Sequence, residues 1–121
     1  MDWTDPPPMH SVAPEPAVVS SGAEVWLAYR TDRGDHFAVL HFTGMYRLAF
    51  GGPGDEPVEA AALPPRSFHA MDAPPRFPDH MRRWLITFPD ETFDVVALGA
   101  RIVVRAVHAT DSNAALGMVL A

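Results

Sequence analysis

The side chains best suited to acid–base chemistry in this sequence are its histidines and a few acidic residues in predicted loops. Six histidines are present, at His10, His36, His41, His69, His80 and His108. General acid–base catalysis needs a titratable group within hydrogen-bond reach of a substrate. If the chain is an enzyme, we expect its catalytic residues to come from His41, His69, Asp72 and Asp90, in a pocket between a sheet and the loop 51–80.

None of these histidines has the spacing of a metal site, and the chain contains no Cys. His36 and His41 are five residues apart on one expected strand, so they point to opposite faces. The densest group is His69, Asp72 and His80, in a proline-rich segment, whereas a zinc site needs three or four converging ligands. We therefore expect hydrogen-bonded structural histidines, no bound metal and no other cofactor.

Hydroxyl and carboxylate groups give equally weak catalytic signals. Ser67 and His69 share a face if their segment is extended, but no G-x-S-x-G motif surrounds the serine. Asp90 follows a proline, which is typical of a type I turn. Asp94 alternates with the apolar Phe93 and is expected on the solvent-exposed face of its strand. Structural roles are the favoured interpretation for all of them.

Arginine side chains are the candidates for ligand binding. The nine basic residues are all Arg, and a guanidinium can grip a carboxylate or phosphate through two parallel hydrogen bonds. The candidate ligand-binding residues are Arg82, Arg101 and Arg105. We expect Arg101 and Arg105 on one face of a strand, where they form a basic stripe if neighbouring strands contribute further arginines. The alternative is a solvated outer face with cross-strand ion pairs.

Length and composition define the class of protein. A chain of 121 residues with 48% hydrophobic and 20% charged residues is typical of one small globular domain. Thirteen prolines argue against a helical bundle, and a net charge of −6 argues against a nucleic-acid partner. The absence of Lys excludes a Schiff-base or P-loop lysine and, with the many Ala, Pro and Gly residues, suggests a bacterial source. With no membrane-length apolar run and no secretion signal, we expect a cytoplasmic protein.

The elements that must position these side chains are mostly strands. We expect residues 1–22 to form a proline-rich, acidic and flexible arm, and residues 23–121 to form a single β-rich domain, with order beginning at Glu24. Residues 24–30 and 36–42 are predicted strands joined by a hairpin turn at 31–35 in which Gly34 supplies the positive φ. A bend at Gly44 precedes a strand at 45–50.

The clearest alternation lies between Arg82 and His108, where we predict an antiparallel meander of three strands. Its inward residues are Trp84, Ile86 and Phe88, then Phe93, Val95 and Ala97, then Ile102, Val104 and Ala106. The loop 51–80 holds seven prolines, with a helical turn at Glu59–Leu63 and an edge strand at Ser67–Met71. A short helix at 114–120 follows, with a final strand from Gly117 as the alternative.

The expected fold is therefore mainly β, with about six strands in antiparallel meanders. These are expected to form a small barrel or a sandwich, with a long proline-rich loop and a short C-terminal helix.

One resemblance is carried by residues 84–97, W-L-I-T-F-P-D-E-T-F-D-V-V-A, and by residues 46–56, Y-R-L-A-F-G-G-P-G-D-E. The first segment resembles the F-T-F-H-D-S-T-F-E run of some short bacterial hypothetical proteins, and the second resembles the segment that precedes it there. This chain has Pro89 where that run has a histidine. The resemblance implies no activity.

The favoured function is a non-catalytic binding protein that recognises a protein partner, a second copy of itself or a small ligand. The residues show no catalytic spacing, while loops rich in aromatic residues and proline suit recognition surfaces. The alternative is a small cofactor-free enzyme, a hydrolase or isomerase. A third interpretation is a structural subunit that closes its sheet edges by dimerising. Nucleic acid and membrane are not expected partners.

Overall fold

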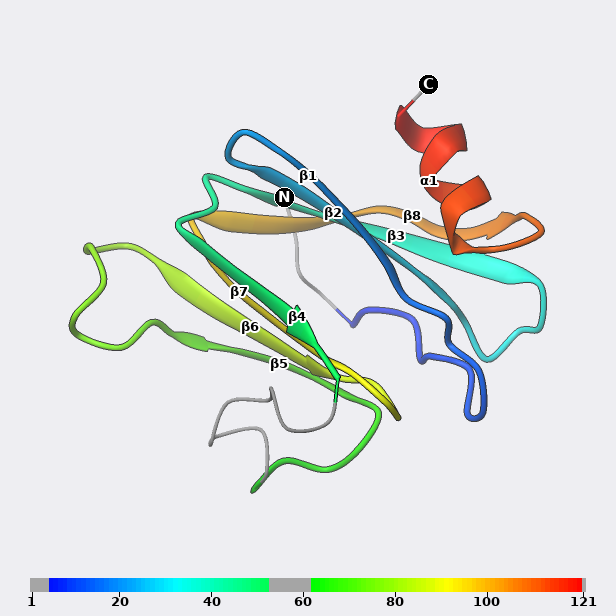
Figure 1. Cartoon of the computed structure of the whole chain (residues 1–121), viewed down its shortest axis with the longest axis horizontal. Coiled ribbons are helices and arrows are strands. Elements are labelled where there is room, and N and C mark those ends of the chain that lie inside the picture. Colours follow the sequence, from blue (N-terminus) through cyan, green and yellow to red (C-terminus); the bar gives the residue numbers. More distant parts are fainter. Residues whose placement is uncertain (1–4, 53–61, 121) are drawn as a thin grey trace. The chain divides into compact units, whose positions relative to one another are not determined.

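The structure, a computed structural model, describes residues 5–52 and 62–120. Strands hold 51% of the described residues, so the mainly β class predicted from the sequence is confirmed. The elements are β1 (Ala17–Ser21), β2 (Glu24–Arg30), β3 (His36–Thr43), β4 (Arg47–Gly51), β5 (Ser67–Asp72), β6 (Arg82–Thr87), β7 (Thr92–Ala97), β8 (Gly99–His108) and α1 (Ser112–Leu120) (Figure 1). Within the described part of the chain, no helix has the length and apolarity needed to cross a membrane.

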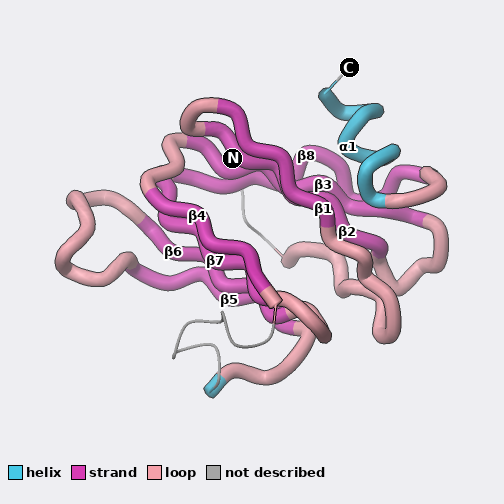
Figure 2. The backbone as a smooth tube through the Cα atoms, in the orientation of Figure 1, coloured by secondary structure: helices cyan, strands magenta, loops and turns pink. Residues whose placement is uncertain are grey.

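The strands form two separate four-stranded sheets, one in each of two compact units. The first unit, residues 1–43 and 100–121, holds the sheet ordered β1-β2-β3-β8 and the helix (Figure 2). The second unit, residues 44–99, holds the sheet ordered β4-β7-β6-β5. Both sheets are open, so the described strands do not close into the barrel that was one of the two expected arrangements.

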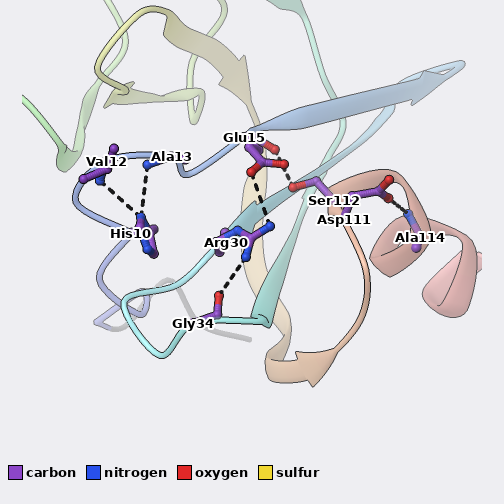
Figure 3. Close-up of polar contacts among 9 residues, drawn as sticks. All are labelled: His10, Val12, Ala13, Glu15, Arg30, Gly34, Asp111, Ser112 and Ala114. Atoms are coloured by element: carbon purple, nitrogen blue, oxygen red, sulfur yellow. Dashed lines mark hydrogen bonds and ion pairs between the residues drawn. The ribbon is translucent and has the colours of Figure 1, made fainter.

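In the first unit, α1 covers one face of the sheet. Ala115 and Leu116 of the helix pack against a buried cluster that includes Ala28, Phe37 and Val39 of the sheet. The predicted turn at 31–35 joins β2 to β3, and Gly34 has the expected positive φ of 77°. The predicted helix is confirmed and begins slightly earlier, at Ser112, because the Asp111 carboxylate accepts the Ala114 N–H at 2.7 Å as an N-cap (Figure 3).

Ordered β structure begins before Glu24, the residue at which we expected it to start. Residues 17–21 form β1, which pairs with β2 from Ala17↔Ala28 to Ser21↔Glu24. Met9, further upstream, is only 5% exposed and forms an isolated bridge with Thr31. A segment that runs beside an open strand edge can pair with it, and β1 contains no proline that would prevent this.

Side-chain contacts also hold this N-terminal segment (Figure 3). The His10 ring Nδ1 accepts the backbone N–H groups of Val12 and Ala13 at 3.2 and 3.0 Å. Arg30 forms an ion pair with Glu15 at 3.3 Å, and the Ser112 hydroxyl at the start of α1 donates to the Glu15 carbonyl. The segment is therefore bonded both to β2 and to the helix.

In the second unit, β6 and β7 form the predicted antiparallel hairpin, with Ile86 opposite Phe93 and Trp84 opposite Val95. Trp84, Phe88 and Phe93 are buried as expected. The predicted edge strand is also confirmed, because among the described strands β5 has β6 as its one neighbour. The expected helical turn at Glu59–Leu63 begins in the segment 53–61, outside the described residues.

The predicted three-strand meander is wrong at its third strand. β8 pairs with β3 in the other sheet, because β7 already has β4 on one side and β6 on the other and has no open edge left. The change of partner also changes which side chains are covered: Ala106, expected to point inward, is exposed, and Ile102 and Val104 are only half-buried.

The first prediction tests the hairpin core. Phe93 is fully buried, whereas its cross-strand neighbour Phe50 is 37% exposed with its ring 6.3 Å away. Phe93→Ala should lower the free energy of unfolding by about 3–5 kcal/mol, and Phe50→Ala by clearly less, because less apolar surface is lost from a covered site. Urea unfolding measures both values. Equal losses would show that the register is wrong.

The second prediction concerns Tyr29, whose buried hydroxyl donates to the Pro7 carbonyl at 2.6 Å. Tyr29→Phe should cost about 0.5–1.5 kcal/mol, the net value of such a bond. Burial raises the pKa of Tyr29, so the unfolded phenol ionises first, above about pH 10, and stability falls as the pH rises further. Urea unfolding at about pH 8 and pH 11 should show a weaker pH dependence in Tyr29→Phe. An unchanged dependence contradicts this role.

Candidate functional site

The most organised polar group in the first unit surrounds His41, on the sheet face that also bears Ala28 and Val39. His41 of β3 lies directly opposite Trp26 of β2, and the two rings stack with centroids 4.8 Å apart and planes 6° apart. The His41 Nε2 lies 2.6 Å from Glu24 Oε1, and the Thr43 hydroxyl donates to the other carboxylate oxygen at 3.0 Å. The His41 side chain is only 12% exposed, so stacking and hydrogen bonding fix the ring.

The second ring nitrogen of His41 is engaged from β8. The Nε–H of Arg101 donates to His41 Nδ1 at 3.1 Å. Because a guanidinium has only donors, Nδ1 must accept, and the ring proton must lie on Nε2, where it is donated to Glu24. A histidine with both nitrogens occupied has no free lone pair with which to accept a proton from a substrate. This geometry argues against His41 as a general base.

The same contact orients Arg101 itself. Its Nε is held by His41, while its two terminal nitrogens have no hydrogen-bond partner among residues 5–52 and 62–120. Arg101 is exposed and lies on β8, an edge strand of its sheet. A guanidinium held at one nitrogen is partly ordered before any ligand arrives, which lowers the entropy cost of binding a carboxylate.

The other catalytic candidates all belong to the second unit, whereas His41 belongs to the first. His69 and Asp72 differ by three positions on β5, so they lie on opposite faces of that sheet. Asp90 lies in the β6–β7 turn, beyond Thr87, whereas Asp72 pairs with Arg82 at the other end of β6. His69, Asp72 and Asp90 therefore do not form one site within the second unit.

Ser67 and His69 do share a face, as the sequence permits, and they are in contact. The Ser67 hydroxyl lies 2.7 Å from His69 Nε2 and 2.6 Å from the Pro64 carbonyl. Thr87 donates its hydroxyl to the same carbonyl at 2.8 Å. When Ser67 also donates to Pro64, His69 becomes the donor to Ser67, which does not activate a nucleophile. The group holds the chain at the start of β5.

Asp72 and Arg82 form an ion pair at 2.9 Å across the ends of β5 and β6. They stand at the rim of a hollow of about 390 Å³ lined by the connecting segment, which includes Phe77 and His80. Asp72 is 91% exposed, so solvent screens the pair strongly. The hollow lies in the second half of the predicted loop, and its described lining contains no Ser, Thr or Cys.

Asp90 is an exposed residue of the β6–β7 turn. The Phe88 N–H donates to the Glu91 carbonyl at 2.8 Å, which closes the turn as predicted. Burial raises the pKa of Glu91, and the neighbouring Asp90 charge raises it further. These features describe a structural turn.

The three arginine candidates do not lie on neighbouring strands of one sheet. Arg82 lies on β6 while Arg101 and Arg105 lie on β8, and these strands belong to different sheets. Arg105 donates to the Asp5 carbonyl at 2.9 Å, whereas Arg101 contacts His41. Of the three ligand-binding candidates, Arg101 alone combines an oriented guanidinium with terminal nitrogens that lack a partner in the described residues.

The closest approach to a metal site joins Asp35 to two histidines at the β2–β3 turn. Asp35 accepts from His108 Nε2 at 2.7 Å, and its other oxygen lies 3.7 Å from His36 Nδ1. The hydrogen bond from His108 lowers the pKa of Asp35. No group of three potential ligands with metal-binding geometry occurs in the part of the chain that the structure describes. His69, Asp72 and His80 form no such group either.

Asp94 corrects another expectation, because it is 1% exposed instead of facing solvent. It accepts two parallel hydrogen bonds from Arg83 of β6, both at 2.9 Å, and one from Arg47 of β4 at 2.8 Å. Arg47 also lies over the Phe77 ring, 5.5 Å from its centroid. The cross-strand pairing of Arg with Asp was foreseeable, but its burial was not.

Two residues of the His41 group, Glu24 and Trp26, were missed as site residues. The sequence contained the information needed to find them. The predicted turn at 31–35 sets a register in which Trp26 lies opposite His41 and Glu24 opposite Thr43. The contribution of Arg101 had no such local signal.

The third prediction follows from the buried Asp94 cluster. Asp94→Ala leaves the Arg83 guanidinium, 6% exposed, without its carboxylate and should cost about 3–5 kcal/mol in urea unfolding. The double variant Arg83→Met with Asp94→Leu should lose markedly less, because both buried charges are then removed together. A double variant that is less stable than Asp94→Ala would contradict this account.

Comparison of the chain with protein-family models, curated proteins and solved structures found no match. The resemblance of residues 46–56 and 84–97 to short bacterial proteins therefore stays a prediction. The function has to be argued from the residues described above.

Proposed function

We propose that this chain is a non-catalytic binding protein that recognises a carboxylate of a partner protein at Arg101. The observation that supports this proposal is the hydrogen bond from Arg101 Nε to His41. It orients the guanidinium and leaves its two terminal nitrogens available for a ligand. The terminal nitrogens of a guanidinium match the two oxygens of a carboxylate. Glu24 and Trp26 serve as the support of His41, not as contacts to the ligand.

The position of Arg101 on an edge strand favours a protein partner over a free small ligand. An extended segment can lie along β8 and place an acidic side chain beside Arg101, as in other cases of strand addition. The strand itself has Arg101, Arg105 and His108 but no acidic residue, so it attracts an acidic segment. The expected bacterial, cytoplasmic setting stays a prediction within this proposal. No specific contact favours the alternative of a small enzyme.

The fourth prediction tests recognition at Arg101. A ¹⁵N-labelled protein is titrated with an extended peptide of alternating Glu and Thr, and with a matched peptide of Gln and Thr. The Glu peptide should shift the Arg101 Nε–H and Trp26 indole signals. Arg101→Gln should weaken binding about tenfold or more, since a charge-assisted hydrogen bond contributes roughly 1.5–3 kcal/mol. Arg101→Lys should bind more tightly than Arg101→Gln but less tightly than the wild-type protein, because an ammonium group cannot form two parallel hydrogen bonds with a carboxylate.

The matched control is Arg33→Gln, which removes the same charge from the exposed β2–β3 turn of the same unit. It should leave the affinity nearly unchanged. Equal weakening by both variants would show general charge attraction, and equal binding of the two peptides would refute carboxylate recognition. Succinate that binds as tightly as the Glu peptide would assign the site to a small ligand.

A further inference from the structure

We infer that two copies of this chain form a homodimer by pairing their β1 strands edge to edge. β1 is the outer strand of the first sheet, at the opposite edge from β8. Its sequence, A-V-V-S-S, contains no charge and no proline, and its last three residues are exposed. Edge strands are normally protected from pairing by charged residues, prolines or bulges. β8 has two arginines, whereas β1 has none of these features.

The β1–β2 turn determines which backbone groups of β1 face outward. Gly22 has a φ of +59° and lies first of the two residues between Ser21 and Glu24, as in a type II′ hairpin turn. Ser21 and Glu24 are therefore a hydrogen-bonded pair. Because such pairs alternate along an antiparallel ladder, Ala17 and Val19 also bond to β2. Val18 and Ser20 then direct their N–H and C=O groups away from the sheet.

These outward groups are complementary to those of a second copy. If a two-fold axis passes beside Val19, Val18 of each copy lies opposite Ser20 of the other, and both pairs can exchange two hydrogen bonds. Val19 then meets its symmetry mate in a non-hydrogen-bonded pair, where side chains approach most closely. Val19 is 37% exposed, so this pairing covers apolar surface. The result is one continuous sheet with both α1 helices on the same face.

The neutrality of β1 selects a second copy as the occupant of this edge. Like charges placed opposite each other destabilise a pair of strands, and two β1 strands bring none together. The chain has a net charge of −6, so two copies repel each other in general. Self-association is therefore favoured at a surface without acidic residues, such as β1. A pair of five-residue strands is a small interface, so we expect a dimer that dissociates on dilution.

The first test is sedimentation velocity over a dilution series, with Ser20→Pro as the disrupting variant. Proline removes the outward Ser20 N–H, which the sheet itself does not use, and is tolerated on the solvent side of an edge strand. We expect the wild-type protein and the control Ser20→Ala to dimerise and Ser20→Pro to stay monomeric with an unchanged circular dichroism spectrum. A monomeric wild-type protein at every concentration, or a folded Ser20→Pro that dimerises equally, overturns the inference.

A second test does not depend on the folding of the proline variant. The chain contains no Cys, so one introduced thiol reports on one contact. Val19→Cys should form an intermolecular disulfide on mild oxidation, since the symmetric pairing brings the two positions within disulfide reach. The control Val12→Cys, at a position 78% exposed and outside β1, should not. Equal cross-linking of both variants contradicts pairing through β1. No cross-linking at position 19 also contradicts it, and this is the result expected if β1 binds another protein instead of a second copy.

Discussion

The pairing of β3 with β8 is the interaction on which the first unit and its candidate site depend. It joins segments that lie far apart in the chain: Arg101 contacts His41 across 60 positions, and at the other end the Ala109 N–H donates to the Asp35 carbonyl at 3.3 Å. This pairing carries the chain from β8 into α1 above the same sheet, where the helix buries the face around Val39. Without it, Arg101 would be an ordinary surface arginine.

Polar side chains in this protein are used mainly to hold structure. His41 is saturated by Glu24 and Arg101, and Asp94 is saturated by arginines from the strands on both sides of it. Buried or half-buried polar groups need such partners, because unsatisfied ones are costly away from water. The proposed binding at Arg101 rests on a guanidinium that is only partly engaged, since His41 contacts its Nε alone among the described residues.

The two edges of the first sheet differ in chemistry, and this difference separates the two proposed contacts. β8 presents Arg101 and Arg105 and suits an acidic segment, whereas β1 is uncharged and suits its own copy. The two contacts lie on opposite sides of the sheet order, so one does not exclude the other. A dimer through β1 would place one Arg101 site at each end of a continuous sheet.

The sequence by itself determined the local structure: the turn at Gly34, the hairpin in which Trp84 and Phe93 are buried, the edge strand β5 and the C-terminal helix. These depend on residue spacing and turn chemistry, which act over a few residues. Only the tertiary structure decided that β8 leaves β7 for β3, that Asp94 is buried and that Arg101 meets His41. Those outcomes depend on which strand edges remain open after the local hairpins form. The alternation of residues along β8 does not identify its partner, because the same pattern suits either strand.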